Sequence, residues 1–227
     1  MTHPVALLPL PRAVLFDLDG TLVDSVQLRI GAWSEALAAA DLPTGRDRLA
    51  PLIGLDGRRL AREIAALAGT PIDEARSEVI DRHAGEVYER LNVAPRPLPG
   101  VGRMIAALDR QGIAWAIATS SRKEQVTDSV AALGLVDEPM IVDASHVEHA
   151  KPEPDLLLLA ARQLDLDPAV CWYVGDSTWD MVSAVAAGML AIGVTAGSAV
   201  DTATLDGAGA AAVVSTLDEL AAAIEAK

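Results

Sequence analysis

The chain has 227 residues, which is enough for one large domain or for one domain that carries a smaller insert. About half of the residues are hydrophobic (51%), which predicts a globular protein with a sizeable core and excludes a disordered chain. The formal net charge of −14 excludes a general nucleic-acid binder, because affinity for a phosphate backbone comes from clustered Lys and Arg.

The first residues carry no recognisable targeting signal. They include Pro4, Pro9 and Pro11 and lack a basic leader. No apolar run approaches the ~20 residues that are needed to cross a bilayer. We therefore expect a soluble, cytoplasmic protein that makes no contact with a membrane.

A short apolar run, Val14 to Phe16, predicts a buried strand near the start of the chain. Two aspartates, Asp17 and Asp19, follow it with one residue between them, and Gly20 comes next. Two like charges this close repel each other unless a cation lies between them. The stretch is therefore the first candidate for a functional site.

The next segment, residues 25–95, contains helix-patterned stretches and no convincing strand. A return segment with three prolines, APRPLPGV, makes a stiff connection back to the rest of the chain. We predict a helical cap domain over residues 25–95, inserted into a core domain of residues 1–24 and 96–227. The helices expected in the cap are Val26–Ala40, Gly57–Leu67 and Asp73–Leu91.

Short apolar runs alternate with helix-patterned segments through the rest of the chain. This alternation predicts an α/β fold, a Rossmann-like parallel sheet with helices on both faces. Several of the helices end at a glycine, as helices commonly do. The expected strands are Ile113–Ser121, Pro139–Ser145, Ala169–Ser177 and Met189–Gly197, and the expected helices are Val101–Gln111, Lys123–Leu133, Pro154–Leu164 and Trp179–Ala187.

Polar residues follow the predicted strands at their carboxyl ends, where open parallel sheets bind ligands. Four carboxylates that converge with one lysine need a shared cation, and Mg²⁺ prefers oxygen ligands and accepts phosphate oxygens. The set therefore suits phosphoryl transfer. Its members are Asp17 and Asp19, Thr119 and Ser120, Lys151, and Asp176 and Asp180.

Four ordered motifs carry a family resemblance: DLDGT at Asp17–Thr21, ATSS at Ala118–Ser121, Lys151 in KPEPD, and GDSTWD at Gly175–Asp180. With a helical insert after the first motif, the chain resembles the haloacid dehalogenase-like (HAD) superfamily. The branch is the one with a helical cap, which includes phosphoglycolate phosphatases and β-phosphoglucomutases. The resemblance covers the chain from Val14 to about Val194.

The resemblance implies a catalytic role for each motif. Asp17 would be the nucleophile and would form an aspartyl-phosphate. Asp19 would protonate the leaving oxygen and then activate water. Thr119 and Lys151 would hold the phosphoryl oxygens, together with backbone N–H groups around Leu18 and Ser120.

The resemblance also implies a metal site. Mg²⁺ would be held by Asp17, by the backbone carbonyl of Asp19 and by Asp176. Asp180 would be a further ligand or would support the others, and it could instead cap the helix that follows.

The cap is expected to set substrate specificity. Arg58, in IGLDGRRL, and Arg29 are candidates to meet an anionic or polar part of the substrate, although a solvated helix face explains either one equally well. β-Phosphoglucomutases usually carry histidine where this chain has Arg29, which argues against mutase activity. Asp19 argues against dehalogenation, and the lack of any lysine before Lys123 argues against a phosphonatase.

We therefore predict a Mg²⁺-dependent phosphatase that hydrolyses a small phosphorylated metabolite through an aspartyl-phosphate. The alternatives are a sugar phosphomutase of the β-phosphoglucomutase type and a non-catalytic, phosphate-binding regulatory protein. We expect a monomer or a weak homodimer.

Overall fold

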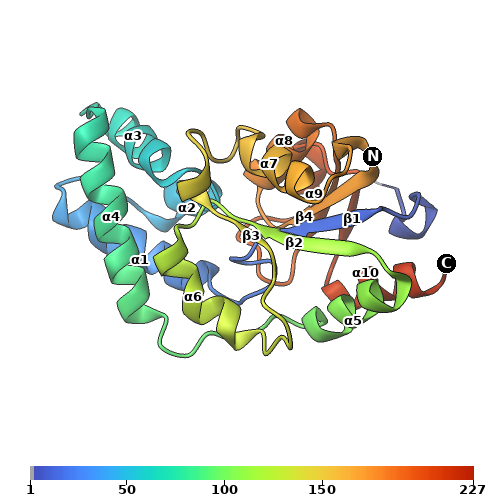
Figure 1. Cartoon of the computed structure of the whole chain (residues 1–227). Helices are drawn as coiled ribbons and strands as arrows, with labels where there is room; N and C mark the ends of the chain where they lie inside the picture. Colours follow the sequence, from blue (N-terminus) through green and yellow to red (C-terminus); the bar gives the residue numbers. More distant parts are fainter. Residues whose placement is uncertain (1–2) are drawn as a thin grey trace.

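A six-stranded parallel sheet forms the centre of the structure, a computed structural model that describes residues 3–227 (Figure 1). The strand order is β3-β2-β1-β4-β5-β6, and every neighbouring pair is parallel. Strand β1 is therefore central and is buried along its whole length. The strands are β1 (Ala13–Phe16), β2 (Ala114–Ala118), β3 (Ile141–Val142), β4 (Cys171–Gly175), β5 (Leu190–Val194) and β6 (Ala212–Val214).

Helices cover both faces of the sheet, which confirms the predicted α/β class. Successive residues of β1 point to opposite faces, so Val14 and Phe16 lie in one apolar cluster and Ala13 and Leu15 in the other. The first face packs against α5 (Val101–Gln111), α6 (Lys123–Ala132) and α10 (Leu217–Glu225), and the second against α7 (Asp155–Gln163), α8 (Thr178–Ala187) and α9 (Thr202–Gly207).

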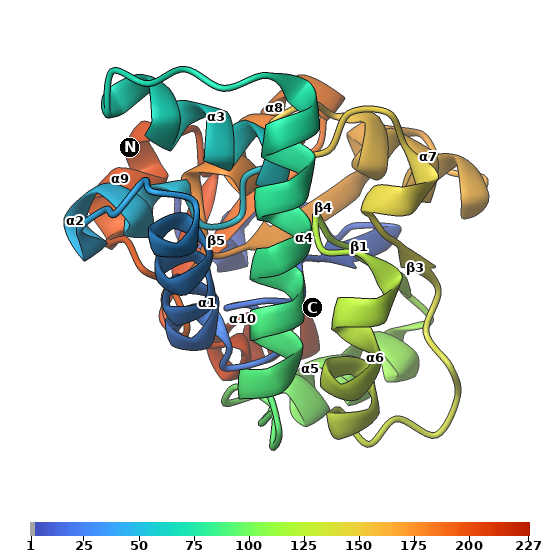
Figure 2. The ribbon, with the colours of Figure 1, turned by 90° about the vertical axis from the view of Figure 1, so that its left-hand side faces the viewer.

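The remaining helices form a separate group at one end of the sheet (Figure 1). They surround their own apolar cluster, which includes Trp33, Leu37, Leu60 and Ile64. In the view of Figure 2, α4 crosses in front of β1 and β4. The boundaries of the two domains at residues 24/25 and 95/96 stay a prediction. The helices are α1 (Val26–Ala39), α2 (Arg46–Leu49), α3 (Gly57–Leu67) and α4 (Glu74–Leu91).

The structure differs from the expected elements mainly in two places. The expected strand Pro139–Ser145 shortens to Ile141–Val142, because this edge strand pairs only with β2 and Asp143 then caps a 3₁₀ turn. The last strand, the last two helices and the short helix α2 are absent from the expected elements. Among the helices of residues 3–227, none is long and apolar enough to cross a membrane.

Candidate active site

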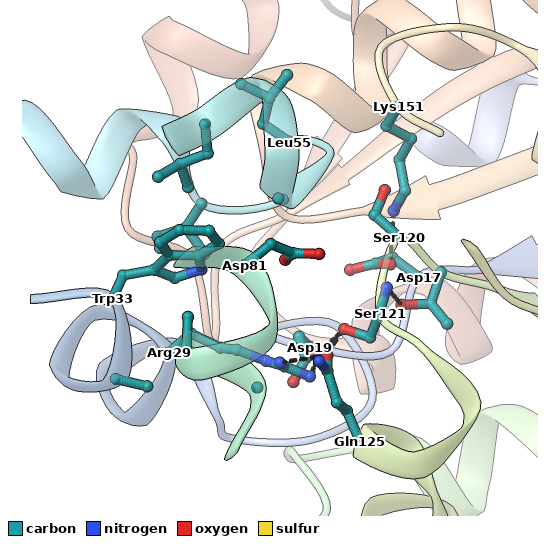
Figure 3. Close-up of a pocket in the computed structure, with 18 of the residues that line it drawn as sticks. Asp17, Asp19, Arg29, Trp33, Leu55, Asp81, Ser120, Ser121, Gln125 and Lys151 are labelled. Atoms are coloured by element: carbon teal, nitrogen blue, oxygen red, sulfur yellow. Dashed lines mark hydrogen bonds and ion pairs between the residues drawn. The ribbon is translucent and has the colours of Figure 1, made fainter. Parts of the chain in front are cut away.

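Three adjacent strands end at the same edge of the sheet and deliver the motif residues there. Asp17 follows β1, Thr119 follows β2 and Asp176 follows β4. They line a cavity of about 60 Å³ that the cap helices cover from the other side (Figure 3). Residues far apart in sequence thus meet because parallel strands present their carboxyl ends together.

Gly20 lets the chain turn between the first aspartates and the rest of the site. Its φ is +78°, in the left-handed region that favours glycine. Its N–H donates to the carbonyl of Val23, and a Cβ here would lie 2.3 Å from Oδ2 of Asp176. Backbone conformation and close approach to Asp176 both require glycine at this position.

We expect Gly20→Ala to lower the free energy of unfolding by about 1–2 kcal/mol or more, because alanine resists the left-handed conformation and its Cβ collides with Asp176. Chemical denaturation measures the effect. Gly102→Ala is the matched control: it lies inside α5 with open space around it, and it should raise the stability by about 0.5–1 kcal/mol. Equal effects of the two substitutions would contradict this account of Gly20.

Lys151 is fully buried at the centre of the site. Its Nζ donates to Oδ1 of Asp17 at 2.6 Å, to Oδ1 of Asp180 at 2.7 Å and to the hydroxyl of Tyr173 at 2.8 Å. Burial by itself would lower the pKa of Lys151, but the two carboxylates outweigh it and hold the pKa above its usual value. Lys151 is therefore a fixed cation that reaches Asp17.

Asp180 uses both of its carboxylate oxygens within the protein. Oδ1 faces Lys151 and the Tyr173 hydroxyl, and Oδ2 accepts from the N–H and the hydroxyl of Ser177. Ser177 also caps α8, and its hydroxyl contacts the backbone N–H of Asp180. Asp180 therefore both caps a helix and positions Lys151.

Asp19 lies at a junction between the core and the cap. Its Oδ1 accepts from Ser25 at 2.5 Å and from Tyr88 at 3.1 Å, and its Oδ2 accepts from Arg29 and Ser121, both at 2.8 Å. Burial would raise the pKa of Asp19, but Arg29 and these hydrogen bonds outweigh burial and lower it. The carboxyl is thus held in its ionised form.

Asp17, Asp176 and Asp180 form a buried carboxylate cluster with donor atoms within 4.8 Å of one another. Burial raises the pKa of Asp17 to about 7, with Lys151 opposing it. Burial and the charges of Asp180 and Asp17 raise the pKa of Asp176 well above its usual value. One lysine does not balance these charges, and an oxygen-rich anionic set of this kind fits a hard divalent cation.

The structure brings most of the predicted site residues into one cavity. Asp17, Asp19, Arg29, Thr119, Ser120, Lys151 and Asp176 all line it. The Ser120 hydroxyl is buried with no hydrogen-bond partner among residues 3–227, so it is available to a ligand.

Three predicted residues do not line this cavity. Leu18 is buried in the core, and Asp180 lies behind Lys151. Arg58 instead contacts Asp56 and the carbonyl of Glu148. A role of Arg58 in substrate binding stays a prediction that this arrangement does not support.

Several residues of the site were missed from the sequence. Tyr173 carried a detectable signal, because a buried tyrosine in a strand needs a partner for its hydroxyl. Tyr88 and Asp81 of α4 and Gln125 of α6 carried none, since only packing of the cap on the core brings them to the site. Gln125 accepts from Arg29 at 3.1 Å, and Arg29 also stacks over the ring of Tyr88.

Comparisons with known proteins agree with this geometry. The model of the family described as haloacid dehalogenase-like hydrolase matches residues 14–194. The chain is 31% identical to β-phosphoglucomutase of Bacillus subtilis, over 82% of this chain and 84% of that protein. It is 33% identical to phosphoglycolate phosphatase of Xylella fastidiosa, over 79% and 78%. The crystal structure of a hydrolase from Pseudomonas syringae is similar, with a TM-score of 0.87, 33% identity and coverage of 92% and 95%.

Proposed function

Because this chain belongs to the haloacid dehalogenase-like hydrolase family, we propose that it is a Mg²⁺-dependent phosphatase that works through an aspartyl-phosphate. The chain is an enzyme of this family, a phosphatase that acts on phosphorylated small molecules. The observation that carries the mechanism is the contact of the Asp17 carboxylate with the buried cation of Lys151 beside Asp176.

Asp17 is proposed as the nucleophile. Lys151 contacts its Oδ1, which leaves Oδ2 to attack phosphorus while the bond to the leaving oxygen breaks. The phosphoryl group passes to the carboxylate, and the leaving oxygen takes a proton from Asp19. Water then gives a proton to Asp19 and attacks the same phosphorus, which releases phosphate and frees Asp17.

Asp19 has to change its contacts during this cycle. In the structure it is paired with Arg29, which suits the step in which Asp19 accepts a proton. In the first step Asp19 must carry a proton, so the contact with Arg29 has to loosen. Thr119, the Ser120 hydroxyl and Lys151 would hold the phosphoryl oxygens meanwhile.

Asp17, Asp176 and the backbone carbonyl of Asp19 would hold Mg²⁺, with Asp180 orienting Lys151 nearby. When bound, Mg²⁺ would act as a Lewis acid that offsets negative charge on the phosphoryl oxygens. Asp17 and Asp176, whose raised pKa values reflect burial and neighbouring carboxylates, support this assignment.

We propose that residues 25–95 act as a cap over a core of residues 1–24 and 96–227. The cap meets the core through the N–H of Asp56, which donates to the carbonyl of Lys151 at 2.9 Å, and through Trp179, which donates to the carbonyl of Pro51. A closed cap would exclude water, and these contacts must break for substrate to enter.

The function is tested by phosphate release from a generic substrate, p-nitrophenyl phosphate, and from a panel of phosphorylated metabolites. We expect release to stop when EDTA removes divalent cations and to return with excess Mg²⁺. Mg²⁺ should also raise the melting temperature of the wild type, and Asp176→Asn should reduce that increase. Full activity in EDTA would contradict the metal assignment. Interconversion of sugar phosphates without net phosphate release would instead identify a mutase.

A further inference from the structure

The roof of the cavity contains one acidic side chain that the proposed chemistry does not use. Asp81 extends from α4 and points across the cavity toward Asp17 and Ser120 (Figure 3). It is 15% exposed, and a Cβ on Gly57 would lie 1.9 Å from its Oδ1. The absence of a side chain at residue 57 therefore makes room for this carboxylate.

Asp81 is held in place from outside the cavity. Arg122, which immediately precedes α6, donates to Oδ2 of Asp81 at 2.8 Å and also to both oxygens of Glu78. Within residues 3–227, the Asp81 carboxylate has no other hydrogen-bond partner. Neither Arg122 nor Glu78 lines the cavity, so Asp81 is the charged group of these three that a ligand can contact.

The balance of charge in the cavity disfavours a second anion. Its lining includes four carboxylates, those of Asp17, Asp19, Asp81 and Asp176, and the two cations Arg29 and Lys151. Lys151 is already paired with Asp17 and Asp180, and Arg29 with Asp19. Even a bound divalent cation would only balance the lining, and the phosphoryl group itself then adds negative charge.

Apart from Asp81 and Arg29, the cap side chains that line the cavity are mainly apolar. Trp33, Ile53, Leu55, Leu60 and Ala84 line it beside Asp81. This combination places one anionic hydrogen-bond acceptor on a largely hydrophobic wall, where the indole N–H of Trp33 is a neutral donor and no second cation lies beside Asp81 in the lining to pair with a carboxylate or a second phosphate.

Resting on the proposed function, we infer that the substrate is a monophosphate whose leaving group carries a hydrogen-bond donor, a hydroxyl or an amine, and no second anion. Asp81 is its specificity residue and accepts that hydrogen bond. A carboxylate in the same place would face the like charge of Asp81 and lose its hydration, while Arg29 and Lys151 are already paired with other carboxylates.

A size-matched series of two-carbon monophosphates tests the inference: 2-hydroxyethyl phosphate, phosphoethanolamine and phosphoglycolate. With the wild type, we expect kcat/KM for the first two to exceed that for phosphoglycolate by about 10-fold or more. This ratio corresponds to the free energy of one charge-assisted hydrogen bond. Asp81→Asn should remove most of this preference. The fall in kcat/KM caused by Asp81→Asn should be larger for phosphoethanolamine than for 2-hydroxyethyl phosphate if an amine is the natural donor. It should be similar for both substrates if a hydroxyl is.

Glu78→Gln is the matched control, because Glu78 shares Arg122 with Asp81 but does not line the cavity. It should leave the preference between substrates unchanged. A wild-type preference for phosphoglycolate, or equal changes in the two variants, would overturn the inference. Hydrolysis of p-nitrophenyl phosphate by the same preparations keeps the two proposals apart: its absence would contradict the proposed phosphatase, and its presence with the wrong preference would contradict only the role of Asp81.

Discussion

Asp17→Asn is expected to reduce kcat/KM for p-nitrophenyl phosphate by at least about 10³-fold, because an amide is a poor nucleophile toward phosphorus. The substitution preserves the size of the side chain, and Lys151 keeps its contact with Asp180. The protein should therefore remain folded. Steady-state release of p-nitrophenol measures the loss, and circular dichroism checks the fold.

Asp24→Asn is the matched control for this variant. Asp24 lies in the same stretch of sequence, is exposed and does not line the cavity. It should keep its activity within about twofold, as substitutions away from a site usually do. An Asp17→Asn enzyme with wild-type activity would show that another group attacks phosphorus or that water does so directly.

The second large effect is expected for Lys151→Met. Lys151 is buried between Asp17 and Asp180, and its removal leaves two buried carboxylates without their cation. Breaking a buried ion pair in this way costs about 3–5 kcal/mol of stability. Urea denaturation in EDTA measures the change, and catalysis should be lost as well. Lys123→Met, at an exposed position at the start of α6, should change stability by less than about 0.5 kcal/mol.

The cost of Lys151→Met should depend on pH in a defined direction. Burial already raises the pKa of Asp17 to about 7, and loss of Lys151 raises it further. The folded state then binds more protons than the unfolded state, so the stability of the variant falls as pH rises above the unfolded pKa of about 3.9. The loss should be larger at about pH 8 than at about pH 5. A loss that is independent of pH, or no loss, would contradict this account of the buried pair.

Much of the fold could be predicted from the sequence because its elements have strong local signals. The predicted helices Gly57–Leu67 and Val101–Gln111 coincide with α3 and α5. Prediction from local sequence fails where a helix is rich in alanine or where a strand is very short. Thus β6 has only three residues, and α10 has no N-cap side-chain hydrogen bond at Thr216 to mark its start.

The residues of the site also differ in whether local sequence could predict them. Asp17, Lys151 and Asp176 each lie in a short sequence motif, so they could be proposed from the sequence. The structure places them together. Asp81 lies on an otherwise ordinary amphipathic helix, and only the packing of α4 over the sheet brings it to the cavity. The proposed substrate contact of Arg58 stays a prediction, since the structure pairs Arg58 with Asp56 outside the cavity.

Arg29 illustrates why a residue type alone does not define a role. The sequence suggested a contact with substrate, which stays a prediction because Arg29 lines the cavity; the structure also pairs it with Asp19, Gln125 and Ser121. Its charge therefore acts on the proposed acid and base of the reaction. No local pattern predicts such a contact between the cap and the core.

The stereochemical course at phosphorus is the most direct test of the central claim that Asp17 carries the phosphoryl group. Each in-line displacement inverts phosphorus, so transfer first to Asp17 and then to water predicts overall retention of configuration. The measurement uses an isotopically chiral phosphorothioate ester hydrolysed by the wild-type enzyme with Mg²⁺. Retention is the result expected from the arrangement of Asp17, Asp19 and Lys151. Inversion would show a single direct attack by water and would contradict the aspartyl-phosphate mechanism.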